Sequence, residues 1–159
     1  MLSRVVMVGI VLTMLALGGL FFFSSSSYQN SFQARMYYFL GDYEQAYALA
    51  KRAYDEDVYN KMAFTVLTQS DIALQYEAYI YEGNSYLDII NTMSTKESIS
   101  EADRSRIKIM SEIMIDGFLA LPSSKLTEKG LKESAQTMRE KFRALHRELF
   151  GKDALESVQ

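Results

Sequence analysis

The side chains best suited to chemistry are few, and the most reactive of them is the only histidine, His146. A lone histidine acts as a general base only when a nucleophile or substrate lies beside it. The sequence has no GxSxG, HExxH or phosphate-loop motif to supply such a group, and the absence of cysteine excludes thiolate metal sites. The sequence therefore predicts a protein that is not an enzyme and needs no cofactor or metal, with His146 as a half-exposed structural residue.

Three arginines near His146 form a row, Arg139, Arg143 and Arg147, at a spacing of four. On a helix this spacing brings like charges together, so an acidic group nearby would relieve their repulsion. Two interpretations stay open. The row is either a solvated face relieved by Glu140 and Glu148, or a face that meets an acidic partner surface or the acidic segment 55–57 of the same chain.

The same segment carries an apolar seam with the 4,3 spacing of heptads. Such a seam must face something, and we expect it either to cap the fold of its own chain or to form a coiled coil with a second copy or a partner. Its members are Leu131, Ala135, Met138, Phe142, Leu145 and Leu149.

All eleven tyrosines lie between Tyr28 and Tyr86. A tyrosine combines a large apolar ring with a hydroxyl that tolerates water, so it serves both in helix packing and on protein-binding surfaces. We expect most of them to be structural and a few to line a binding groove. The candidates for binding are Tyr37, Tyr47, Tyr54 and Tyr79.

The stretch from Gln33 to Tyr54 places a glycine turn between two helical patterns. Gly41 can end the first helix in a left-handed conformation, Asp42 can cap the second, and small residues let the helices approach closely. This arrangement resembles one tetratricopeptide repeat, which implies a right-handed stack of helical hairpins that binds proteins. The residues that carry the resemblance are Ala34, Tyr37, Gly41, Asp42, Tyr43, Ala46, Ala50 and Ala53.

The N-terminal residues 5–23 are uncharged and would span about 28 Å as a helix, so the sequence predicts a transmembrane helix. A cleaved secretory signal is the alternative. Arg4 lies on the short side of this segment, which predicts that residues 1–4 lie in the cytoplasm. In a bacterium the protein would then be anchored in the inner membrane, and residues 24–159 would face the periplasm.

After a linker over 24–30, we expect six helices over Tyr28 to Phe150. Asn60 and Ser100 are residues of the types that commonly cap the start of a helix. Gly83 and Pro122 are of the types that commonly mark the end of one. The expected domains are TPR-like hairpins over 31–122, a capping or interaction helix over 123–150 and a flexible tail over 151–159.

The net charge of −3 is carried unevenly, since the region up to residue 122 is acidic and the C-terminal part basic. An acidic body disfavours nucleic acid as a partner. Together these features predict a scaffold or adaptor in an envelope machine such as a flagellar motor or secretion system. The partners would be its membrane proteins, the bilayer through residues 5–23, and a second copy through the C-terminal helix. The alternative function is a chaperone for a membrane-protein client.

Overall fold

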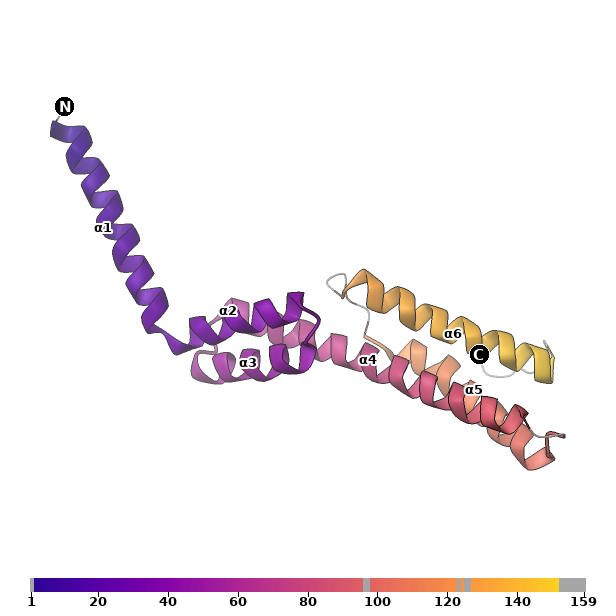
Figure 1. Cartoon of the computed structure of the whole chain (residues 1–159). Helices are drawn as coiled ribbons and strands as arrows, with labels where there is room; N and C mark the ends of the chain where they lie inside the picture. Colours follow the sequence, from indigo (N-terminus) through magenta and orange to yellow (C-terminus); the bar gives the residue numbers. More distant parts are fainter. Residues whose placement is uncertain (1, 96–97, 123, 125–126, 152–159) are drawn as a thin grey trace. The chain divides into compact units, whose positions relative to one another are not determined.

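The computed structural model describes residues 2–95, 98–122, 124 and 127–151, and every regular element in these ranges is an α-helix. The prediction of an all-α chain is confirmed, and the helices are compatible with a helical-hairpin fold. The chain divides into two compact units, Met1–Asp71 and Ile72–Gln159. The helices are α1 (Leu2–Ser24), α2 (Ser26–Phe39), α3 (Tyr43–Glu56), α4 (Lys61–Ser94), α5 (Glu101–Ala120) and α6 (Lys129–Phe150) (Figure 1).

The prediction of a transmembrane helix over residues 5–23 is wrong. Among the described residues, none of the helices combines the length with the apolarity that a bilayer crossing demands.

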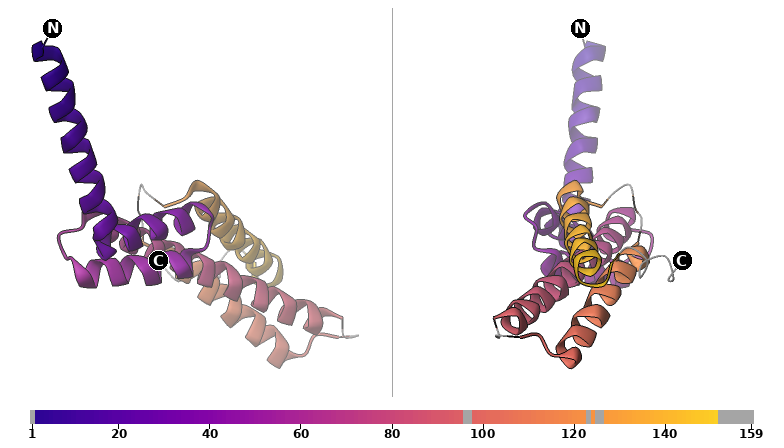
Figure 2. Two further views of the ribbon diagram at one scale, coloured as in Figure 1. Left: turned by 60° about the vertical axis from the view of Figure 1, so that its left-hand side comes forward. Right: turned by 90° about the vertical axis from the view of Figure 1, so that its right-hand side faces the viewer.

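The first unit is built around the α2–α3 hairpin, whose helices lie side by side (Figure 2). Gly41 has a φ of +79°, the left-handed conformation that ends a helix. Asp42 then caps α3, because its Oδ1 accepts a hydrogen bond of 3.0 Å from the backbone N–H of Gln45. The close approach of the helices follows from small residues with no exposed surface, namely Ala34, Ala46, Ala50 and Ala53.

The start of α4 is fixed by Asn60, as expected, since its Oδ1 accepts from the backbone N–H groups of Met62 and Ala63 at 3.1 Å each. The expected helix end at Gly83 is wrong, because α4 continues without a break to Ser94. Gly83 is buried inside the helix, where a Cβ atom would lie 2.6 Å from Cγ of Met138. The glycine makes room for a neighbouring helix rather than ending its own.

The long α4 changes the predicted architecture, because the two helices expected before and after Gly83 are one helix. The predicted stack of three hairpins after a membrane span is therefore replaced by the α2–α3 hairpin, α4, and the α5–α6 pair. In the second unit, α5 and α6 pack on the part of α4 that belongs to it. The core there contains Tyr76, Tyr79, Ile107, Met114, Met138 and Phe142.

The expected boundaries differ at two further places. The structure starts α2 at Ser26, within the range expected to be a linker. Most of the expected tail, residues 152–159, lies outside the described residues.

Candidate protein-binding surface

Helix α2 carries small side chains on its buried face and large ones on its exposed face. Ser27, Ser31 and Ala34 are buried against the rest of the first unit, and all three side chains are small. Their size is set by the neighbour, because the facing alanines of α3 allow the helices to close only when both sides are small. The fully buried positions of α2 are thus filled by small residues, and of its large side chains only the tyrosines Tyr28 and Tyr38 are half-buried.

The large apolar residues along the other side of α2, together with Leu40 at its C-cap, instead point to solvent. They recur at spacings of four, three and one, which places them on one stripe of the helix surface. Their exposed fractions lie between 51% and 76%, although an ordinary surface helix buries such a stripe. We call this surface the outer stripe; it consists of Phe32, Met36, Phe39 and Leu40.

One positive charge borders the outer stripe. Arg35 is the only charged residue of α2, and its guanidinium carbon lies 5.5 Å from the centre of the Phe39 ring. This is a cation–π contact, which holds the guanidinium beside the apolar surface and leaves its N–H groups available for an acceptor.

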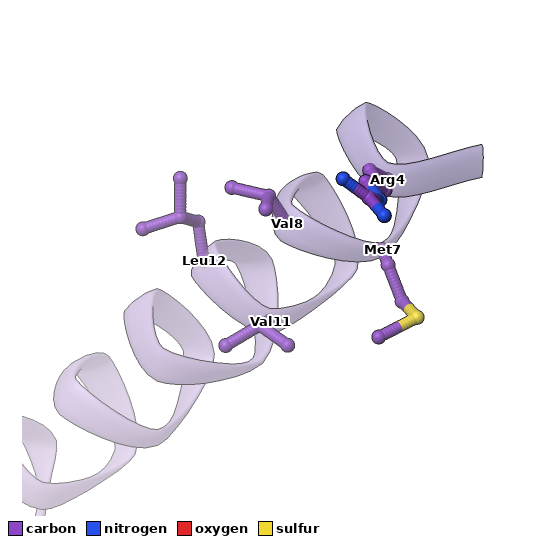
Figure 3. Close-up of a pocket in the computed structure, with 5 residues that line it drawn as sticks. All are labelled: Arg4, Met7, Val8, Val11 and Leu12. Atoms are coloured by element: carbon purple, nitrogen blue, oxygen red, sulfur yellow. The ribbon is translucent and has the colours of Figure 1, made fainter. Parts of the chain in front are cut away.

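A second exposed apolar surface lies on α1. Figure 3 shows the side chains of Met7, Val8, Val11 and Leu12 projecting from the helix, with Arg4 about one turn before Val8. All five are exposed. Since α1 carries apolar residues around its circumference, no single face of it is marked as a binding stripe.

The four tyrosines proposed for binding have different surroundings. Tyr37 is exposed, Tyr47 and Tyr54 are half-buried, and Tyr79 is buried in the core of the second unit. The most exposed tyrosines are Tyr59 and Tyr81, at 88% and 79%, and sequence reasoning singled out neither. The position of Tyr59 directly before the cap Asn60 was the available signal, since a residue outside a helix start is commonly exposed.

Tyr79 has a structural environment. Its hydroxyl donates a hydrogen bond of 2.8 Å to the carbonyl oxygen of Met114, and its ring meets Phe118 edge-on at 6.1 Å between centroids. Burial raises the pKa of Tyr79 to about 12, with the positive charge of Arg139 acting in the opposite direction.

This pKa predicts a stability change at high pH. An unfolded tyrosine ionises near pH 10, so the stabilisation from un-ionised Tyr79 is fully present below pH 10 and is lost as the pH rises toward 12. We expect the urea midpoint of the second unit to fall over that window, and Tyr79→Phe to remove this part of the fall. Circular dichroism at several pH values measures it. An identical pH dependence in Tyr79→Phe would contradict the assignment.

The arginine row is not a uniform surface. The Arg139 guanidinium carbon lies 4.9 Å from the centre of the Phe118 ring, and Arg143 pairs with Glu140 at 3.3 Å. Both are half-buried, while Arg147 is exposed. These contacts give Arg139 and Arg143 partners within the chain, so a binding role in the row falls mainly to Arg147.

The apolar seam of α6 faces its own chain. Ala135, Met138 and Phe142 belong to the buried core of the second unit, and the other three members, Leu131, Leu145 and Leu149, pack against it half-buried. The seam is therefore covered by the core of its own unit, which agrees with the interpretation of a helix that caps the fold.

His146 is fully buried rather than half-exposed, which corrects the expectation from sequence. Its Nε2 lies 3.6 Å from Oε1 of Glu112, and its ring centre lies 5.1 Å from that of Phe150. Neither ring nitrogen has a hydrogen-bond partner among the described residues. In those residues no group of three or more acidic, histidine or cysteine side chains converges on a metal position.

Comparison of the chain with protein-family models, with curated proteins and with solved structures found no match.

Proposed function

We propose that this chain is a protein-binding scaffold or adaptor in a multiprotein assembly, and that the outer stripe of α2 is its docking surface. The observation that carries the proposal is the inverted α2, which buries serine and alanine and exposes two phenylalanines and a methionine, with an exposed leucine at its C-cap. Exposing large apolar side chains is unfavourable, whereas burying them against a partner releases about 25 cal/mol for each Å². The stripe is stabilised only when a partner covers it.

The chemistry of the stripe specifies one kind of partner. From Phe32 to Leu40 the stripe extends over about 12 Å, which matches roughly two turns of a helix. Four such side chains expose on the order of a few hundred Å², the size at which an apolar patch on a monomer is often functional. Arg35 stands at the edge without an acidic residue on α2. The partner we propose is therefore an amphipathic helix with an acidic residue beside its apolar face.

The hairpin supports a tetratricopeptide-like assignment for the first unit. Gly41 is left-handed, Asp42 caps the second helix and the alanines expected to bring the helices together are buried. In such folds each hairpin exposes a surface that binds other proteins. We propose this assignment for the α2–α3 hairpin alone, because the unbroken α4 departs from a hairpin.

A double substitution tests the docking surface. We expect Phe32→Glu with Phe39→Glu to reduce the amount of co-purified partner at least tenfold, because two charges would be desolvated in the complex. Ala48→Glu on the exposed part of α3 is the matched control and should leave recovery unchanged. Since both phenylalanines are more than half exposed, hydrogen exchange of α2 and α3 should remain as in the parent protein.

A charge swap identifies the partner segment. We expect Arg35→Glu to weaken binding, and an acidic-to-lysine change beside the apolar face of the partner helix to restore it. Rescue by only one partner position locates the contact. Full binding by both the double variant and Arg35→Glu would refute the docking surface.

A chaperone function is the second candidate, and the exposed apolar side chains of α1 favour it, since they can hold an apolar client segment. Stoichiometry separates the two functions. A scaffold is recovered with its partner in a fixed ratio from the finished assembly, whereas a chaperone is recovered with its client only before assembly is complete.

A further inference from the structure

The turn between α3 and α4 forms an open pocket of about 290 Å³. None of the residues that line it belongs to the outer stripe of α2. Two aromatic rings make one wall, since the centroids of Tyr54 and Phe64 lie 5.8 Å apart with a tilt of 44°. We call it the aromatic pocket; its lining residues are Tyr54, Val58, Tyr59, Lys61 and Phe64.

The aromatic pocket is open and apolar, yet the backbone of the turn that carries it is held by hydrogen bonds. Val58, Tyr59 and Phe64 are 57%, 88% and 53% exposed. Asp57 fixes the turn, because its Oδ1 accepts from the backbone N–H of Tyr59 at 2.9 Å and its carbonyl oxygen from that of Asn60 at 3.0 Å. A pocket that is already shaped loses little conformational entropy when a ligand enters.

Lys61 places a positive charge in the lining of the pocket. It is the only charged residue among those that line the pocket, it is exposed, and it has no ion-pair partner in the part of the chain that the structure describes. The acidic groups nearby are engaged elsewhere. Asp55 pairs with Lys51 at 2.9 Å, and Glu56 accepts a hydrogen bond of 2.6 Å from the hydroxyl of Ser26.

We propose that the aromatic pocket binds a large apolar side chain that carries a carboxylate beside it, within a segment of the protein partner. The apolar group packs on the rings of Tyr54 and Phe64 and on Val58, and the carboxylate pairs with the ammonium group of Lys61. That the ligand is part of a protein rests on the proposed function. The preference of the pocket for an apolar group with a carboxylate is independent of the proposed function.

Three probes with one aromatic side chain and different charges test this preference. N-acetylphenylalanine carries a carboxylate, N-acetylphenylalaninamide is neutral and phenylalaninamide is a cation. We expect saturable changes in the NMR signals of residues 54–64 of the full chain at millimolar concentration. The carboxylate should bind about two- to fivefold more tightly than the neutral amide, as an exposed ion pair allows, and the cation most weakly.

Two variants separate the charge from the apolar contact. Lys61→Met should abolish the preference for the carboxylate and leave binding of the neutral amide unchanged. Phe64→Ala should weaken all three probes, and since Phe64 is more than half exposed, the fold should tolerate the change. The control Lys141→Met removes an exposed lysine of α6, outside the pocket, and should leave the order of the probes as it is.

Three results would overturn the proposal: tightest binding of the cation, the same order of the probes in Lys61→Met as in the parent, or no saturable change at residues 54–64. None of these results affects the docking surface on α2, which is tested by partner recovery. Conversely, loss of the α2 proposal would leave the measured preference of the pocket standing, with the source of the carboxylate changed from a partner segment to a small molecule.

Discussion

Replacing Asn60 by leucine is expected to destabilise the first unit by about 2–4 kcal/mol. The side chain of Asn60 is 1% exposed and caps α4 through two backbone N–H groups. Its Nδ2 also donates to the hydroxyl oxygens of Ser27 at 2.9 Å and Ser31 at 3.2 Å. Leucine removes all four hydrogen bonds and leaves the N-terminal N–H groups of Met62 and Ala63 without the acceptor that Asn60 supplies.

Hydrogen exchange of α2 and α3 amides measures this effect in the first unit, because the two units need not unfold together. Asn60→Asp is the matched variant, since it keeps the capping oxygen and replaces the amide donor by a second carboxylate oxygen. We expect it to cost less than Asn60→Leu. A change of less than about 0.5 kcal/mol in Asn60→Leu, the level of an ordinary surface substitution, would contradict the role of this network.

Replacing Gly83 by alanine is expected to destabilise the second unit by about 1–3 kcal/mol. A Cβ atom at this position would lie 2.6 Å from Cγ and 2.7 Å from Sδ of Met138, and 2.9 Å from Cε of Met114. The alanine gains about 1 kcal/mol of helix propensity, but overpacking between α4, α5 and α6 outweighs that gain.

Gly117→Ala in α5 is the control with the opposite sign. There the new Cβ would lie 3.6 Å from the nearest atom of the Tyr79 ring, an ordinary contact. The helix propensity is then gained without strain, and we expect stabilisation of about 0.5–1 kcal/mol. Urea unfolding of both variants measures the difference. Stabilisation of equal size by the two substitutions would show that Gly83 is not a packing position.

Helix caps and turns were predictable from the sequence, because they depend on a residue's own backbone conformation or on a backbone group close by in the sequence. Asp42, Asn60 and Ser100 were expected to cap helices, and each accepts a backbone N–H in the structure. Gly41 was expected to be left-handed, and it is. In these cases the side chain and its partner are at most three residues apart, so the pattern contains the whole interaction.

Features that depend on distant residues were not predictable in the same way. Glycine commonly ends a helix, but Gly83 is needed because a side chain there would collide with Met138, which is 55 positions later in the sequence. His146 was expected to be half-exposed, and its burial depends on how α6 meets α5. The outer stripe has helical spacing that ordinarily indicates a buried face. The alanines of α3, together with the hydrogen bonds from Asn60 to Ser27 and Ser31, keep the small residues of α2 on the inner face instead.

The most direct test of the docking surface is photo-crosslinking in cells at native expression. A photoreactive phenylalanine analogue is placed singly at positions 32, 36 and 39 of the outer stripe, and at the exposed positions 44, 48 and 52 of α3 as controls. We predict that the three stripe positions crosslink to one protein through a helix with an acidic residue beside its apolar face, and that the α3 positions do not. Equal crosslinking from both helices, or none from the stripe, would contradict the assignment of α2 as the surface that binds a partner.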